Sequence, residues 1–245
     1  MMRAVTRRWL AGAGALGLAT LGACDGRTSR DADTPPDVDD VAAATVTLEP
    51  GHCAGVVVED GRHALTAAHC VRPDDTRVFL SFLGGQRLGG TYVHVDRGRD
   101  VAVIRLDARA PVRPLEVADG LPAPGDGLVF TGRNDRPGDA QEAQLERLGR
   151  CPSLPEVPAA LFTTMRGRPG DSGAPLVDSR MQVVGLVHGG AACSIATPTA
   201  GLGTLVEDLS RGGPELARQA PRGGASPPPG RPAGRCLPAR RRFRT

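Results

Sequence analysis

Aromatic residues make up only 3% of this chain of 245 residues, so valine, leucine and alanine must fill its core. Lysine is absent, and all thirty basic residues are arginine, which reflects codon usage more than function. The sequence holds no internal repeat and no second long apolar run after the one near its start. Its histidines, cysteines and carboxylates do not have metal-ligand spacing, so we expect no metal and no other cofactor.

The first residues have the pattern of an export signal. Three arginines precede an apolar run, residues 9–23, that is too short to span a membrane as a stable helix. The run ends in Leu21–Cys24, which is similar to the lipobox of bacterial lipoproteins. We therefore expect a signal peptide over residues 1–23 and a lipid on Cys24 that anchors the protein to a cell-envelope membrane. An ordinary secretory signal is the alternative, and the protein would then be secreted.

Composition divides the remaining chain into three parts. Residues 24–41 are polar and indicate a disordered tether, residues 42–210 have the composition of a globular domain, and residues 211–245 are rich in Pro, Gly and Arg. Nine arginines and one glutamate give this tail a charge of +8, and the first 24 residues carry +3. Residues 25–210 must therefore carry −8 to give the total of +3. We expect a disordered tail and no nucleic-acid partner, because nothing sequence-specific accompanies the basic charge.

Short apolar runs bounded by Gly, Pro and Asp recur through the globular part, at a length typical of strands. These runs are Thr45–Leu48, Ala54–Val58, Ala64–Ala68, Arg77–Phe82, Thr91–Val95, Val101–Leu106, Gly127–Thr131, Val183–His188 and Gly201–Val206. Many short strands at close spacing, with turn signals between them, predict an all-β barrel or sandwich.

A serine lies between two glycines in the polar turn Gly170–Leu176. A hydroxyl nucleophile needs backbone N–H groups aimed at the oxyanion that it creates. A glycine two residues before the serine allows the N–H groups of Gly170 and Ser172 to point the same way. Gly-Asp-Ser-Gly is also a common turn composition, so this motif alone leaves a purely structural turn open.

Two upstream segments complete a pattern. Leu65–Cys70 ends an apolar run with His69, and Asp100 opens the run Val101–Leu106. Each residue by itself is typical of a core histidine or a turn aspartate. In the order His, Asp, Ser, the three segments resemble the signatures of the chymotrypsin-like (trypsin-like) serine protease family over roughly residues 46–206.

The resemblance implies a fold and a division of roles. The fold would be all-β, with two antiparallel six-stranded β-barrels and the triad in the cleft between them. Ser172 would be the nucleophile, His69 the general base and Asp100 the carboxylate that orients the imidazole. The N–H groups of Gly170 and Ser172 would form the oxyanion hole.

Substrate binding is also implied by the resemblance. Gly189–Gly190 would pair with the substrate backbone, and Gly201, in a segment similar to the family's Pro-Gly-Val-Tyr-Thr, would form a pocket wall. Counting back six residues from the nucleophile places Arg166, followed by Gly167, at the pocket base, where a guanidinium would select acidic side chains. Two alternatives stay open. The arginine turns to solvent and leaves a neutral pocket, or a one-residue shift places Met165 there and favours apolar side chains.

Two departures from the family bear on activation and on the triad. No Ile-Val-Gly-Gly segment is present to supply an inserted N-terminus beside Asp171, so an internal arginine would neutralise this carboxylate, with Arg133 and Arg150 as candidates. His188 stands where the family has a serine near the triad aspartate. Its imidazole would donate a hydrogen bond to Asp100 or be of no consequence.

Six cysteines in an exported protein indicate disulfides. The resemblance implies a Cys53–Cys70 bond that closes the histidine loop. Cys151–Cys193 is the next pair, because both residues would lie in the second barrel. With Cys24 lipidated, Cys236 in the tail would be left free.

We therefore expect a serine endopeptidase that acts on proteins or peptides. The alternative is a protease-like fold retained as a binding or scaffolding module, although homologues of that kind usually lose a triad member. A periplasmic chaperone-protease is disfavoured by Cys70 directly after His69 and by the lack of a downstream peptide-binding domain in this sequence.

Overall fold

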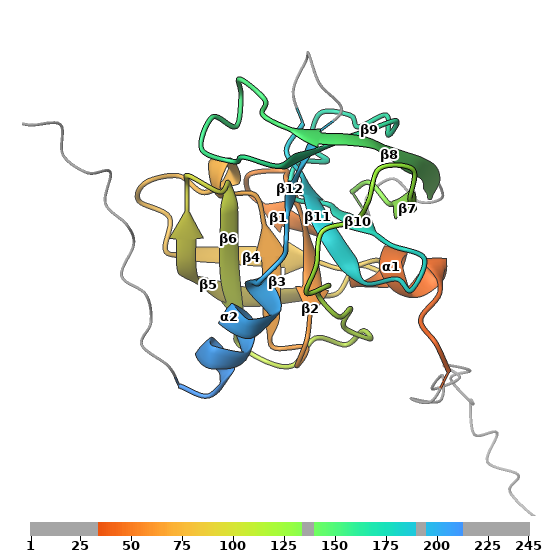
Figure 1. The fold of residues 1–245 in the computed structure, drawn as a ribbon. Coiled ribbons are helices and arrows are strands. Elements are labelled where there is room, and N and C mark those ends of the chain that lie inside the picture. Colours follow the sequence, from red (N-terminus) through yellow and green to blue (C-terminus); the bar gives the residue numbers. More distant parts are fainter. Residues whose placement is uncertain (1–33, 134–139, 190–194, 213–245) are drawn as a thin grey trace, which may run out of the picture. The chain divides into compact units, whose positions relative to one another are not determined.

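The computed structural model describes residues 34–133, 140–189 and 195–212. Two closed antiparallel β-barrels account for nearly all of its regular structure (Figure 1). The all-β prediction and the prediction of two six-stranded barrels are both confirmed. None of the helices in the described ranges is long and apolar enough to cross a membrane.

The first barrel is closed in the order β1-β2-β3-β6-β5-β4. Its strands are β1 (Thr45–Glu49), β2 (Ala54–Val58), β3 (His63–Thr66), β4 (Arg77–Ser81), β5 (Arg87–Asp96) and β6 (Val101–Leu106). β2 and β3 are buried along their whole length, whereas β4 alternates between exposed and buried residues. This alternation arises because successive side chains of a strand point to opposite faces of the sheet.

The second barrel is closed in the order β7-β8-β9-β12-β11-β10, which repeats the topology of the first strand for strand. Its strands are β7 (Gly127–Phe130), β8 (Gln141–Gly149), β9 (Ala160–Thr163), β10 (Pro175–Val177), β11 (Val183–Val187) and β12 (Ile195–Pro198). The β3–β4 connection is therefore equivalent to the β9–β10 connection. The β5–β6 connection is likewise equivalent to the β11–β12 connection.

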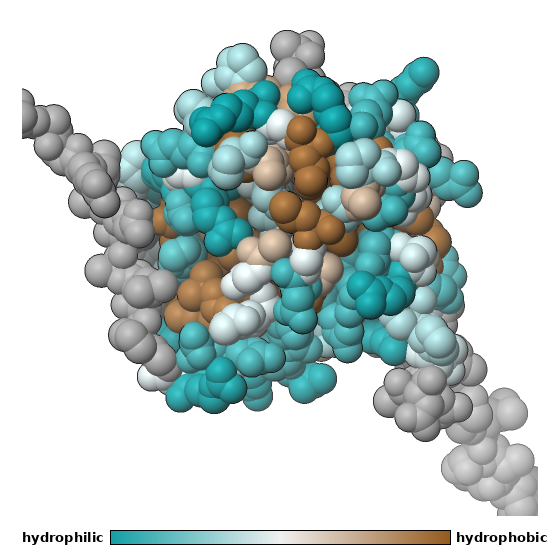
Figure 2. Space-filling view, viewed as in Figure 1, coloured by the Kyte–Doolittle hydropathy of each residue, from teal (hydrophilic) through white to brown (hydrophobic). Residues whose placement is uncertain are grey.

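Each barrel has its own apolar interior, and a third cluster joins them. That cluster combines Val56 and Leu65 of the first barrel with Val183 and Leu186 of the second. Buried side chains are dominated by valine, leucine and alanine, as the scarcity of aromatic residues predicts. On the face drawn in Figure 2, hydrophobic residues form separate patches within a largely hydrophilic surface.

Helix α1 (Val38–Ala44) occupies residues that the sequence places partly in the tether. Asp37 Oδ1 caps the helix by accepting a hydrogen bond from the Asp40 N–H, and Asp40 Oδ2 accepts one from the Asp37 N–H. Val41 and Ala44 are completely buried in the cluster between the barrels. Ordered structure therefore begins before residue 42, because a capped turn brings two apolar side chains into the core.

The segment predicted as a strand at Gly201–Val206 is instead the start of helix α2 (Leu202–Ser210). Leu202, Leu205, Val206 and Leu209 recur at helical spacing, and all four pack against the cluster between the barrels. Gly201 precedes the helix with a φ of 80°, a left-handed conformation that favours glycine. The strand prediction for this segment is wrong because its apolar residues follow the period of a helix, three to four residues, and not that of a strand.

Candidate active site

His69 and Asp100 lie on two connections of the first barrel. His69 belongs to a 3-10 turn, Ala68–Cys70, that follows β3, and Asp100 immediately precedes β6 with a φ of 56°. The His69 N–H donates to Asp100 Oδ1 over 2.8 Å. His69 Nδ1 lies 3.0 Å from Oδ1 and 2.9 Å from Oδ2 of the same carboxylate. These contacts fix the ring and require the proton of neutral His69 on Nδ1, which leaves Nε2 as a base.

Asp100 is 4% exposed, and its charge is stabilised by these contacts. Burial by itself raises the pKa of this carboxyl group. Hydrogen bonds from His188 and His69 outweigh the burial and lower the pKa to about 2. Asp100 is therefore ionised at neutral pH, as an anion beside an imidazole that must accept a proton.

Ser172 approaches from the second barrel, on the β9–β10 connection that is equivalent to the connection carrying His69. Its carbonyl oxygen accepts a hydrogen bond of 2.8 Å from the Ala54 N–H of β2, so the first barrel holds the serine turn. Its hydroxyl donates to the His188 carbonyl oxygen over 3.2 Å rather than to His69. A rotation of this side chain is therefore needed before Ser172 meets His69.

Gly173 shows why the serine turn requires glycine. Its φ is 85°, and its N–H donates to the Val187 carbonyl oxygen over 2.7 Å. A Cβ atom there would overlap the Ala54 carbonyl oxygen and lie 2.5 Å from Thr66 Oγ1. The two barrels are therefore packed too closely at this point for any side chain.

The backbone on either side of Asp171 carries two N–H groups that make no intramolecular hydrogen bond with a described residue. Within the described ranges, the N–H groups of Gly170 and Ser172 donate no hydrogen bond, so both are available. The Asp171 side chain, 4% exposed, accepts the Arg133 N–H over 3.1 Å and the Arg168 N–H over 2.6 Å. These bonds anchor the turn at its middle residue.

The expectation that an arginine side chain neutralises Asp171 is wrong. Arg133 Nη1 donates to the His52 carbonyl oxygen over 2.9 Å, and no ion pair joins Asp171 to a described arginine. Arg150 is exposed. The backbone N–H groups of Arg133 and Arg168 stabilise this carboxylate instead. Sequence reasoning missed this arrangement because a backbone donor leaves no residue-type signal.

The His188 side chain makes the hydrogen bond to Asp100 that the sequence left open. Its Nδ1 lies 2.5 Å from Asp100 Oδ2. Its ring meets that of His69 edge-on, with the centroids 5.0 Å apart and the planes at 80°. His188 is therefore part of the cluster, on the connection equivalent to the one that carries Asp100.

Two supporting residues around this cluster were not predicted. Thr197 Oγ1 donates to the Arg99 carbonyl oxygen over 2.6 Å, next to Asp100. Thr66 Oγ1 donates to the Ala54 carbonyl oxygen over 2.7 Å, next to the Ser172 turn. A threonine in a strand is so common that the sequence gives no signal for either role.

The predicted Cys53–Cys70 disulfide is confirmed. Cys70 directly follows His69, and its sulfur lies 3.9 Å from the Ser172 carbonyl oxygen. The bond therefore holds the histidine turn close to the serine turn. Cys193, Cys24 and Cys236 lie outside the described residues, so the Cys151–Cys193 pair, the lipidation and the free thiol stay predictions.

The predicted pocket residues are only partly brought together. Gly189 adjoins the serine, since a Cβ there would lie 3.2 Å from Ser172 Oγ. Gly190 lies outside the described residues. Gly201 lies exposed at the start of α2, after β12, and not on a strand beside β11. The register is the cause, because β12, and not the segment after it, pairs with β11.

Arg166 and Gly167 are exposed, whereas Met165 is 2% exposed and packs in the core of the second barrel. The guanidinium thus has the solvent-facing position that the sequence left open as an alternative. A preference for acidic side chains loses its structural support, because an exposed guanidinium is hydrated rather than enclosed.

Among the residues that the structure describes, two groups of side chains have donor atoms close enough to suggest a metal. In the first, Cys53 and Cys70 are joined as a disulfide and offer no thiolate. In the second, His69, Asp100 and His188 have N–O distances of 2.5 to 3.0 Å. Ligands of a tetrahedral zinc ion, at about 2.0–2.2 Å from it, would stand roughly 3.3 Å apart. The donors therefore fit hydrogen bonding with one another better than an ion.

The chain is similar to one protein family and to solved protease structures. The model of the family described as trypsin-like peptidase domain matches residues 53–186. A serine endoprotease from Yersinia pestis has 19% identity and a TM-score of 0.57, over 73% of this chain and 68% of the other. An HtrA-type protease solved with a tripeptide has 19% identity and a TM-score of 0.59, over 70% and 62% respectively.

At such identities the two solved structures bear on the fold alone, and this chain spans about two thirds of their length. No protein with a curated description matches the chain. The family match covers more than half of the sequence and includes His69, Asp100 and Ser172. The chain therefore belongs to the trypsin-like peptidase domain family and is, by that membership, a serine endopeptidase.

Proposed function

We propose that this peptidase cleaves peptide bonds through an acyl-enzyme, with Ser172 as nucleophile, His69 as base and Asp100 as its partner. The observation that carries the proposal is the pairing of His69 Nδ1 with both oxygens of a buried, ionised Asp100. This pairing leaves Nε2 unprotonated and stabilises the imidazolium that forms when Nε2 takes a proton.

The first step begins when Ser172 Oγ leaves the His188 carbonyl oxygen and turns toward His69. Oγ bonds to the substrate carbonyl carbon, its proton passes to His69 Nε2, and the carbonyl π electrons move to oxygen. The Gly170 and Ser172 N–H groups then donate to that oxygen, and each such donor contributes about 3–4 kcal/mol in enzymes of this kind.

The tetrahedral intermediate collapses as the C–N bond breaks, and the departing amine takes the proton from His69. The acyl group remains on Ser172 Oγ. A water molecule then gives a proton to His69 and adds to the acyl carbon. Breakage of the C–Oγ bond releases the carboxylic acid and returns the proton to the serine.

Labelling with a fluorophosphonate tests the proposal, because only an activated serine attacks this probe. We expect one label per chain at Ser172, none in Ser172→Ala, and about a 10³-fold slower reaction in His69→Ala. Ser210→Ala is a matched control, since Ser210 is exposed on α2. Intact, oxidised protein that takes up no probe would exclude the enzyme and leave a binding module.

We propose further that the pocket is neutral and accepts small or apolar side chains, because Arg166 is exposed. Arg166→Ala should then change kcat/KM for apolar peptides less than about twofold. Dominant cleavage after Asp or Glu in a peptide library, lost in Arg166→Ala, would restore the acidic preference.

Export and a lipid anchor on Cys24 form the last part of the proposal. The Cys53–Cys70 disulfide supports export, because disulfides persist mainly in oxidising compartments. Cys24→Ser should release the protein from the membrane fraction of its host cell, with Cys236→Ser as control. Release of neither variant, or of both, would contradict the anchor.

A further inference from the structure

The connection that carries Asp100 also carries an arginine that reaches the histidine turn. Arg97 follows β5 directly, three residues before Asp100, and is exposed. Its Nη1 donates to the Ala68 carbonyl oxygen over 3.1 Å, and its Nη2 donates to the Val71 carbonyl oxygen over 2.9 Å. One guanidinium therefore bridges two backbone carbonyl groups, one before His69 and one after it.

The histidine turn is too short to be stable by itself. Its internal hydrogen bonds are two, each of 3.1 Å, from the Cys70 N–H to the Ala67 carbonyl oxygen and from the Val71 N–H to the Ala68 carbonyl oxygen. A 3-10 turn of this length has poor hydrogen-bond geometry and depends on outside partners. The guanidinium of Arg97 is such a partner, because its planar fork presents two donors at a fixed separation.

Two other attachments hold the turn, and neither contacts its carbonyl groups. The His69 N–H donates to Asp100 Oδ1 over 2.8 Å, and Cys70 is joined to Cys53. The disulfide acts through a side chain, and the bonds between its sulfur and the backbone can rotate. Arg97 adds the contact that fixes the carbonyl side of the turn to the connection that carries the aspartate.

The loop from which this arginine extends is itself anchored to both barrels. Asp96 Oδ1, at the end of β5, accepts the Arg99 N–H over 3.0 Å and closes the loop. The Arg99 guanidinium donates to the Ala200 carbonyl oxygen of the second barrel over 2.9 Å. A Cβ atom at Gly98 would overlap the Glu156 carboxylate, which also belongs to the second barrel. A loop fixed in this way can hold the histidine turn in place.

We propose that Arg97 is a positioning residue that locks the histidine turn against the Asp100 connection and so sets the direction of His69 Nε2. The inference rests on the proposed function, because this direction matters only if Nε2 takes the proton of Ser172. Without the bridge, the turn would swing about its remaining attachments. A base displaced by about 1 Å slows a reaction by up to about 100-fold, even when the substrate binds as before.

Three variants test the proposal. Arg97→Met keeps an unbranched side chain and removes both donors, whereas Arg97→Lys keeps the charge but replaces the fork with a single ammonium. Arg180→Met is the matched control, because Arg180 also donates two guanidinium hydrogen bonds, to Asp178 on the β10–β11 connection, which carries no residue of the site. We expect Arg97→Met to lower kcat about 10-fold with KM changed less than about twofold. Arg97→Lys should recover a part of that loss, and Arg180→Met should lose nothing.

Amide hydrogen exchange gives a readout that does not need activity. NMR of protein carrying Ser172→Ala follows the N–H groups of residues 69–71, all of which donate hydrogen bonds. Exchange of these three groups should become at least about 10-fold faster when Arg97→Met is added, because the turn opens more often. It should stay the same when Arg180→Met is added.

An unchanged kcat in Arg97→Met would overturn the proposal. A loss confined to KM would also overturn it, since Arg97 would then contact the substrate, and full recovery in Arg97→Lys would show that charge matters and the bridge does not. Failure of the proposed function is separate. Wild-type protein without a fluorophosphonate label would contradict catalysis, while the exchange rates still decide the bridge. A labelled wild type with exchange rates unaffected by Arg97→Met would contradict the bridge alone.

Discussion

The two barrels share one topology but differ in the length and burial of their strands. The first has β2 and β3 buried along their whole length, and a disulfide beside its histidine turn. The second contains β8, a nine-residue strand with only Ala143 and Leu145 buried, and a three-residue strand, β10. Topologically equivalent connections of the two barrels nevertheless carry the four residues of the site, which are His69, Asp100, Ser172 and His188.

His69 and Ser172 lie on equivalent connections, and Asp100 and His188 lie on the other equivalent pair. The site is thus made where two similar ends of two similar barrels meet. The two barrels therefore repeat one topology without repeating a sequence pattern, since the sequence contains no repeat.

Gly173→Ala should separate the barrels where they are packed most closely. A methyl group there must displace the Ala54 carbonyl oxygen, and the alanine backbone must keep the left-handed conformation of Gly173. We expect a loss of about 3 kcal/mol in the free energy of unfolding and no probe labelling. Gly85→Ala is the matched control, with a φ of 84° and no atom within 4 Å of the new Cβ. It should cost about 1 kcal/mol, and an equal cost in both variants would contradict the packing argument.

Removal of the Cys53–Cys70 disulfide should weaken the first barrel beside its histidine turn. Cys53→Ala/Cys70→Ala opens a loop with a sequence separation of 17, which costs about 3 kcal/mol in the chain-entropy model. Urea unfolding measures this loss, and probe labelling should slow because His69 adjoins Cys70. An unchanged unfolding midpoint would show that the disulfide does not stabilise the first barrel.

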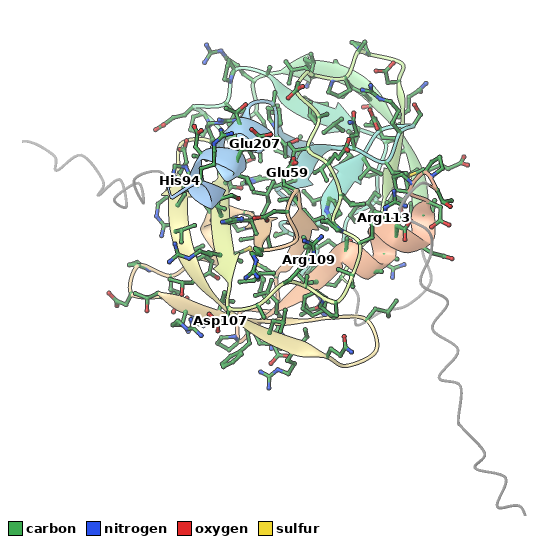
Figure 3. The ribbon with its side chains drawn as sticks, turned by 90° about the horizontal axis from the view of Figure 1, so that it is seen from below. Glu59, His94, Asp107, Arg109, Arg113 and Glu207 are labelled. Atoms are coloured by element: carbon green, nitrogen blue, oxygen red, sulfur yellow. A yellow bond between two sulfur atoms is a disulfide. The ribbon has the colours of Figure 1, made fainter. Side chains whose placement is uncertain are left out.

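Asp100→Asn tests how far acid stability resides at the interface. Because the pKa of Asp100 is lowered from 3.8 to about 2, the folded state gains stability above pH 4 that is lost as the pH falls toward 2. The wild type should exceed the variant by about 2 kcal/mol at pH 7 and by almost nothing at pH 2. Asp107, labelled in Figure 3, is half-exposed beside Arg77 and serves as control, since Asp107→Asn should show little pH dependence. A gap that persists at pH 2 would contradict the linkage.

Glu59→Gln concerns the side of the first barrel that α2 covers, where Figure 3 shows Glu59 and Glu207 labelled. Burial raises the pKa of Glu59, Glu116 and Glu207 add to the rise, and a hydrogen bond from the Val117 N–H opposes it. A raised pKa means that the ionised form costs stability at neutral pH. The amide keeps the acceptor without the charge, so Tm should rise slightly at pH 7 and not at pH 4. Asp74→Asn is the control, since Asp74 is exposed and is not among the groups that raise the pKa of Glu59. A lower Tm for Glu59→Gln at pH 7 would contradict this interpretation.

The sequence predicted the first barrel better than the second, for a physical reason. β1 to β6 contain continuous apolar runs or clear alternation, and each was anticipated within a few residues. β8 is mostly polar, and β9, β10 and β12 have only three or four residues, so no pattern separates them from loops. They are strands because their neighbours in the barrel supply the hydrogen bonds.

For the site, the His69–Asp100 pair, the Gly170–Gly173 turn and the Cys53–Cys70 bond could be anticipated from residue types in a fixed order. The support of Asp171 could not, because it comes from the backbone N–H groups of Arg133 and Arg168. The misplaced Gly201 shows a second limit. Register between β11 and β12 is set by pairing across the barrel, which the resemblance of one short segment does not reveal.

The hydrogen bond from the Ala54 N–H to the Ser172 carbonyl oxygen has a consequence for how the enzyme fails. The turn that presents the nucleophile is held by a strand of the other barrel, so a slight parting of the barrels disorders the turn while both sheets remain intact. In a denaturant titration, turnover should therefore disappear before the far-ultraviolet circular dichroism changes. Turnover would then report the docking of the two barrels, whereas circular dichroism would report only their sheets.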